Sequence, residues 1–133
     1  NYDSSVGYRY VWLKYGLDIF YDKPIIGHGG GSFKNSLNKI LINNTNLNQD
    51  FETQNPHNEF VSIGVQTGII GILFFIGFFY YFFVYTKHEN TGLATFSLVL
   101  ISSIFNALFY DNVLGIFSVI IISCALRLYE LKN

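Results

Sequence analysis

The chain has 133 residues, of which 50% are hydrophobic and 19% aromatic, and its apolar residues are concentrated in the second half. This composition is typical of a membrane protein. The net charge is −1 and the eight lysines and arginines are scattered. That distribution excludes the basic stripe of a nucleic-acid-binding protein, so we expect no nucleic acid as a partner. The single cysteine, Cys124, excludes a disulfide within the chain.

The first predicted element is an amphipathic helix from Gly7 to Tyr21, with Lys14 and Asp18 on its polar side. Arg9 is an anomaly, because helical spacing places it on the apolar side. The pattern leaves two interpretations of this side chain open. Either its guanidinium binds an anion, or its aliphatic part lies along apolar neighbours while the guanidinium reaches water or lipid phosphate. The apolar positions on that side are Trp12, Leu13, Gly16, Leu17 and Phe20.

Pro24 ends this helix, and a glycine-rich loop follows from Gly27 to Phe33. Glycines permit left-handed backbone angles, and successive loop amides can hold a phosphate. Gly27, His28 and Gly29 are therefore candidate substrate-binding residues. A structural turn with a solvated histidine is the more common alternative, and the loop lacks the Gly-Lys-Ser/Thr of a P-loop.

The segment from residue 34 to residue 54 is rich in asparagine, with a short apolar patch at Ile40 to Ile42. We expect a surface loop over the site, in which the patch forms one or two helical turns.

The next segment, Asn55-Pro56-His57-Asn58-Glu59, lies just before a long apolar run. Pro56 favours a helix that begins around His57 and continues toward the bilayer. An imidazole titrates near neutral pH, so His57 is a candidate proton acceptor at a membrane surface. Asn58 and Glu59 either orient the acceptor or the imidazole, or cap the helix and face solvent.

The remaining apolar runs predict about three transmembrane helices, at 61–86, 92–110 and 112–129. The third is short for a span. Asn106 interrupts the second run, and its expected role is a hydrogen bond to another helix. The fold class is an all-α integral membrane protein with an extracytoplasmic region at 1–60. Residues 1–6 contain neither an initiator methionine nor a signal peptide, so we expect the C-terminal part of a longer polytopic protein.

Loop charges predict the orientation of these spans. Lys87 follows the first run and Arg127 and Lys132 follow the third, so the positive-inside rule places those ends in the cytoplasm. The region 1–60 would then lie on the periplasmic side of a bacterial inner membrane. Because no nucleotide pool exists there, a transferase at that site would need a substrate that is already activated and carried by lipid.

Two motifs resemble those of the O-antigen ligase family, multispan enzymes of GT-C-like architecture. Arg9-Tyr10-Val11-Trp12-Leu13 is similar to the family's Arg-x-x-x-Leu element. His57-Asn58, followed after nine residues by Gly68-Ile69-Ile70-Gly71, is similar to its His-Asn and Gly-x-x-Gly elements. Family members carry a further arginine in an earlier external segment, which this chain does not include.

The resemblance implies transfer of a glycan from undecaprenyl diphosphate to an acceptor hydroxyl on lipid A core, without nucleotide and without metal. Arg9 would hold the diphosphate and His57 would act as the base. Polymerases of the same family use a growing glycan as the acceptor, and protein O-oligosaccharyltransferases use a serine or threonine. Two rival classes remain, a metal-dependent hydrolase that uses His28, His57 and Glu59, and a noncatalytic transporter or scaffold segment.

Overall fold

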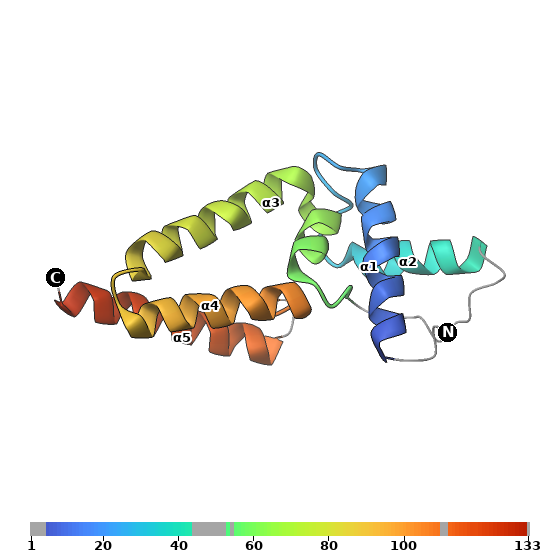
Figure 1. Ribbon diagram of the computed structural model, residues 1–133. Coiled ribbons are helices and arrows are strands. Elements are labelled where there is room, and N and C mark those ends of the chain that lie inside the picture. Colours follow the sequence, from blue (N-terminus) through green and yellow to red (C-terminus); the bar gives the residue numbers. More distant parts are fainter. Residues whose placement is uncertain (1–4, 44–52, 54, 110–111, 133) are drawn as a thin grey trace.

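The computed structural model describes residues 5–43, 53, 55–109 and 112–132. Its secondary structure is helical, and no strand occurs among those residues, as the sequence predicted. Figure 1 shows α1 and α2 at one end of the molecule, α4 and α5 extending to the other, and α3 connecting the two ends. The helices are α1 (Ser5–Asp22), α2 (Ser32–Asn43), α3 (Glu59–Thr86), α4 (Asn90–Phe105) and α5 (Asn112–Lys132).

Helix α1 matches the predicted helix, but its buried face is rotated from the expected one. Val11, Gly16 and Ile19 are buried, whereas Leu13 and Leu17 are 36% and 40% exposed. Gly16 explains the difference, because a Cβ at this position would contact Val61 of α3 and Phe33 of α2. The helix therefore packs closely through its glycine, and its leucines are turned outward.

Helix α2 begins in a segment that the sequence predicted as loop, so that prediction is wrong for 32–39, while the helical turns predicted at Ile40 to Ile42 are confirmed as its last part. Phe33, Leu37 and Leu41 are buried at four-residue spacing, which places them on one face of a helix. Asparagines between them have low helix propensity, but burial of this apolar face outweighs that cost. The rest of the predicted asparagine-rich loop falls mainly outside the described residues.

Helix α3 is broken at Gly68, whose φ of 68° and ψ of −161° are not helical. A side chain at this position would overlap the carbonyl oxygen of Ile25, and the next amide, Ile69 N–H, donates to Pro24 O at 2.7 Å. Glycine is thus required both for the backbone angles and for the close approach of the loop that follows α1. The first glycine of the Gly-x-x-Gly motif accordingly marks the bend in α3 that Figure 1 shows.

The break separates two hydrophobic cores, so each half of α3 belongs to a different one. The first half packs on α1 and α2, and the second half packs on α4 and α5. The boundary between the cores thus lies inside the range predicted as the first span. The first core contains Val11, Ile19, Phe33, Leu37, Leu41, Val61 and Val65, and the second contains Phe79, Phe82, Val99, Leu108, Ile122 and Ala125.

Of the described helices, α3 is the one long and apolar enough to cross a membrane, where the sequence predicted about three. Helix α4 has 16 residues and ends at Phe105 instead of residue 110. At 1.5 Å per residue it is about 24 Å long, shorter than the roughly 30 Å of a hydrocarbon core. The outer face of α3 is strongly apolar, with Leu73 and Phe74 61% and 77% exposed.

Candidate functional site

The segment before α3 holds His57 in an unusual backbone conformation. Its φ is 51°, in the left-handed region that residues with side chains seldom adopt. The helix predicted to begin around His57 is confirmed, with its start shifted to Glu59: Asn58 is the N-cap of α3, with Oδ1 accepting from Val61 N–H at 3.0 Å. The predicted capping role of Asn58 is confirmed. Residues held in sparsely populated conformations often mark functional sites.

Contacts from three directions stabilise this conformation of His57. Its backbone N–H donates to Asn55 Oδ1 at 2.9 Å. Its imidazole stacks on the indole of Trp12, with 4.8 Å between ring centroids and 30° between the planes. Its Nδ1 lies 3.4 Å from Asn106 Oδ1. The ring is therefore fixed by α1 on one face and by the end of α4 at one nitrogen.

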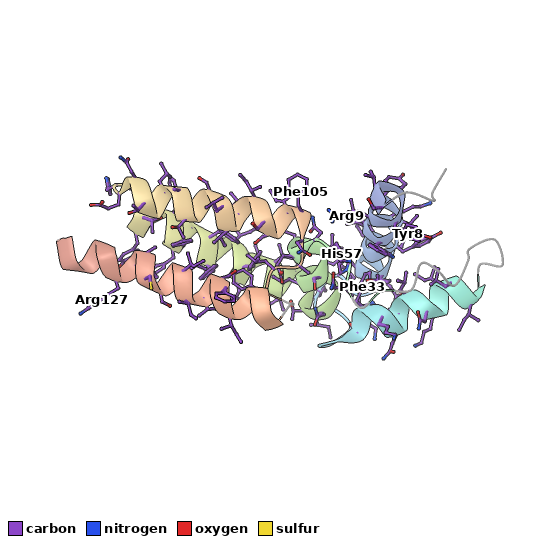
Figure 2. The ribbon with its side chains drawn as sticks, turned by 90° about the horizontal axis from the view of Figure 1, so that it is seen from below. Tyr8, Arg9, Phe33, His57, Phe105 and Arg127 are labelled. Carbon is purple, nitrogen blue, oxygen red and sulfur yellow. The ribbon has the colours of Figure 1, made fainter. Side chains whose placement is uncertain are left out.

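Arg9 and His57 line the same pocket, which has a volume of about 430 Å³. Figure 2 shows them with Phe105 where α1, the start of α3 and the end of α4 meet. The arginine side chain is exposed and the histidine is half-buried, so both are accessible to a ligand in this pocket. The other lining residues are Val6, Tyr10, Leu13, Pro56, Asn58, Ile104 and Phe105.

Asn58 belongs to this pocket and also ties two helices together. Its Nδ2 donates to Ile104 O at 2.8 Å, while its Oδ1 caps α3. Both ends of its amide are therefore occupied by backbone groups. This side chain fixes the end of α4 against the start of α3.

Glu59 follows directly but does not line the pocket. Its side chain is buried, at 4% exposure, and its Oε2 accepts from Phe109 N–H at 2.8 Å. The carboxylate thus supports the link between α4 and α5. The structure does not bring it toward the ligand space beside His57.

The glycine loop lies at the break in α3, away from the pocket of Arg9 and His57. The amides of His28 and Gly29 donate to Val65 O and Gln66 O, at 2.8 and 2.9 Å. A Cβ on Gly27 would overlap the backbone of Gln66. These amides satisfy carbonyls that the helix break leaves without intrahelical partners.

The imidazole of His28 contacts the end of α1. Its Nε2 lies 2.8 Å from Ile19 O and 3.6 Å from the Asp22 carboxylate. It lines a separate cavity of about 320 Å³ between α1 and α2, together with Asp18 and Lys39. The structure therefore separates His28 from His57. Within the described ranges, no group of three His, Cys, Asp or Glu side chains is placed to hold a metal ion.

The sequence did not predict the contacts that hold the imidazole. Trp12 was assigned only to the apolar face of α1, and Asn106 was expected to bond to another helix. The signal that did exist was the polar Asn106 inside an apolar run, since such residues require a partner. That partner turned out to be His57.

Comparison with protein families gives a match to the model described as O-antigen ligase over residues 1–76. This range contains Arg9, His57 and the Gly68 break, but not the end of α4 that completes the pocket. Comparison with curated proteins finds no match, and comparison with solved structures finds none. Since the match covers more than half of the chain, this protein belongs to the O-antigen ligase family.

Proposed function

We propose that this chain transfers a glycan from undecaprenyl diphosphate to an acceptor hydroxyl at the periplasmic face of the bacterial inner membrane. The observation that carries the proposal is the common pocket of Arg9 and His57, which lie far apart in the sequence. Arg9 supplies a fixed cation, and His57 supplies an imidazole nitrogen that can accept a proton. Transfer from a lipid diphosphate can use the cation at the leaving group and the base at the acceptor hydroxyl.

Arg9 binds the diphosphate in this proposal. Its planar guanidinium can donate to two phosphate oxygens at once, and its positive charge stabilises the charge that grows on the leaving group. The exposed position of the side chain leaves its donors accessible to a ligand. Arg9 therefore supplies within the protein the charge that many transferases take from a metal ion.

His57 acts as the general base. It takes the proton of the acceptor hydroxyl as that oxygen forms a bond to the anomeric carbon of the glycan. The bond from this carbon to the diphosphate oxygen breaks, and its electron pair leaves with the diphosphate. A positioned base of this kind contributes about 10²- to 10⁴-fold to a rate.

The apolar part of the pocket wall suits a lipid-borne substrate. Leu13, Ile104 and Phe105 line the pocket, and the two from α4 lie at the end of an apolar helix. We place α3 across the membrane, with the part after Gly68 about 27 Å long at 1.5 Å per residue. The lipid tail would then lie beside the helices while the diphosphate reaches Arg9.

The acceptor that we propose is lipid A core. The products of a deletion strain distinguish this ligase activity from the polymerase and protein-glycosylation activities of the same family. Unattached polymeric lipid-linked glycan indicates loss of a ligase, whereas single repeat units on the acceptor indicate loss of a polymerase. Unchanged lipid A core with unglycosylated protein indicates a protein-directed enzyme.

Two substitutions in the full chain test the roles of the pocket residues. We expect His57→Ala and Arg9→Lys each to reduce transfer at least about a hundredfold, the latter because an ammonium loses the bidentate geometry. The assay uses the full chain in vesicles with a lipid-diphosphate-linked glycan and lipid A core. Membrane abundance of both variants should stay near that of the wild type.

Matched controls make the same changes away from the pocket. His88→Ala alters an exposed histidine between α3 and α4, and Arg127→Lys alters an exposed arginine on α5. Both should retain wild-type transfer. Normal transfer by His57→Ala or Arg9→Lys would contradict the proposed role of that residue, and normal transfer by both would show that the reaction does not use this pocket. Absence of transfer by the wild type would favour a noncatalytic chain.

A further inference from the structure

We propose that Asn106 is a positioning residue for His57, and that it holds the proton of the neutral imidazole on Nδ1 so that Nε2 is the basic nitrogen in the pocket. This inference rests on the proposed function of His57 as the base. It assigns the atom that accepts the proton and a residue of α4 that controls it. Asn106 lies outside the residues that match the family.

The oxygen of the Asn106 side chain is identified by a backbone contact. Ala107 N–H donates to Asn106 Oδ1 at 3.0 Å. A backbone N–H can only donate, so the amide atom that receives it must be the oxygen and not Nδ2. The same oxygen lies 3.4 Å from His57 Nδ1.

This contact selects one tautomer of the imidazole. An amide oxygen can only accept, so Nδ1 must carry the hydrogen if the two atoms are bonded. In the neutral ring the lone pair is then on Nε2. Trp12 covers one face of the ring, and Nε2 remains as the nitrogen available to the pocket that His57 lines.

The position of Asn106 is fixed by the end of α4. Its backbone is extended, with φ −150° and ψ 158°, and its N–H donates to Ser102 O at 2.8 Å. Asn58 fixes the same helix end from the other side through its bond to Ile104 O. Asn58 and Asn106 thus both link the start of α3 to the end of α4. Together they set the distance between His57 and Asn106.

Other ionisable groups near the imidazole come from α1 and α3. Arg9 and Tyr10 line the same pocket, and Glu59 directs its Oε2 to the Phe109 amide. In the described part of the chain, the amide oxygen of Asn106 is the side-chain acceptor at Nδ1. A substitution at Asn106 should therefore change the tautomer and position of the His57 imidazole, while the proposed contact of Arg9 with the diphosphate stays the same.

The kinetic test compares Asn106→Leu with Asn106→Asp in the full chain, with transfer measured between pH 5 and pH 9. Asn106→Leu has no acceptor and should lower kcat about tenfold while KM for the lipid-linked glycan stays unchanged. Asn106→Asp keeps the acceptor and should restore kcat at high pH. The acid limb of its pH–rate profile should move to higher pH, because the added carboxylate stabilises the protonated imidazole of His57.

A spectroscopic test determines the tautomer of the His57 ring independently of the transfer assay. The full chain is labelled with ¹⁵N at histidine, and loss of signal in His57→Ala assigns the ring nitrogens. The wild type and Asn106→Asp should show hydrogen on Nδ1, and Asn106→Leu should lose that preference. Asn90→Leu, at the other end of α4, is the matched control and should leave both readouts unchanged.

The outcomes separate this inference from the proposed function. Full transfer by His57→Ala would overturn the role of the base, whatever Asn106 does. If His57→Ala abolishes transfer but Asn106→Leu keeps the wild-type kcat, pH profile and tautomer, only the positioning role is overturned. If Asn106→Leu does not fold, two other results overturn the positioning role of Asn106. One is a pH–rate profile of Asn106→Asp whose acid limb is not shifted, and the other is a wild-type His57 ring whose hydrogen is on Nε2.

Discussion

Two histidine-bearing segments contact the first half of α3, one at each end. The segment 55–58 precedes its first turn, and the loop 27–31 closes its end at Gly68. In the first segment the side chains converge, with His57 held by Trp12 and Asn106 beside an open pocket. In the second the backbone amides converge, and they donate to helix carbonyls.

The difference shows what decides the role of a glycine-rich loop. Free amides in such a loop can bind an anion, but a broken helix presents carbonyls that compete for the same donors. Here Val65 and Gln66 provide those carbonyls. In our proposal the loop holds the bend in α3, and the chemistry belongs to the segment that begins the helix.

The largest effect on folding is expected for Gly68→Ala. The new side chain would overlap Ile25 O at backbone angles that only glycine readily adopts, so we expect a loss of about 3 kcal/mol or more in the free energy of unfolding. Thermal unfolding of the detergent-solubilised full chain measures it. Gly30→Ala is the control, because a Cβ there meets nothing within 4 Å. Equal stability of the two variants would contradict the role of the bend.

An intermediate effect on stability is expected for Glu59→Leu. This substitution tests whether Glu59 has a structural role while nearby His57 has a catalytic one. Loss of the carboxylate leaves the Phe109 amide without this acceptor, and we expect a cost of about 1–3 kcal/mol. Glu59→Gln keeps an acceptor oxygen and should recover part of the stability. Transfer per folded molecule should stay within about threefold of the wild type for Glu59→Gln, since the carboxylate is outside the pocket. A loss of transfer as large as that of His57→Ala would place Glu59 in the chemistry.

The smallest effect is expected for His28→Gln. The imidazole bonds to Ile19 O at the end of α1 and lines a different cavity from His57, so transfer should stay within about twofold of the wild type. The same assay in vesicles measures it. A hundredfold loss of transfer by His28→Gln, with stability unchanged, would give the glycine loop a part in substrate binding and remove the contrast between the two segments.

The sequence predicted the helical class, the helix that carries Arg9, and the pairing of Arg9 with the His57 segment through their resemblance to one family. Local patterns suffice for such features because apolar spacing and short motifs are properties of neighbouring residues. It predicted only the turns of α2 at Ile40 to Ile42 and missed the start of this helix, because asparagines interrupt the buried face of Phe33, Leu37 and Leu41. Here tertiary burial outweighed local propensity.

The chemical groups of the site can be read from the amino-acid sequence alone: a guanidinium on α1, an imidazole before α3, and apolar helices beyond. The orientation of the imidazole depends on the folded structure, because the contacts of its ring come from elements distant along the chain. Asn106 is separated from His57 by 49 positions, and Trp12 comes from α1. The orientation of the His57 ring and the proposed choice of its basic nitrogen depend on those two contacts, and no local pattern encodes them.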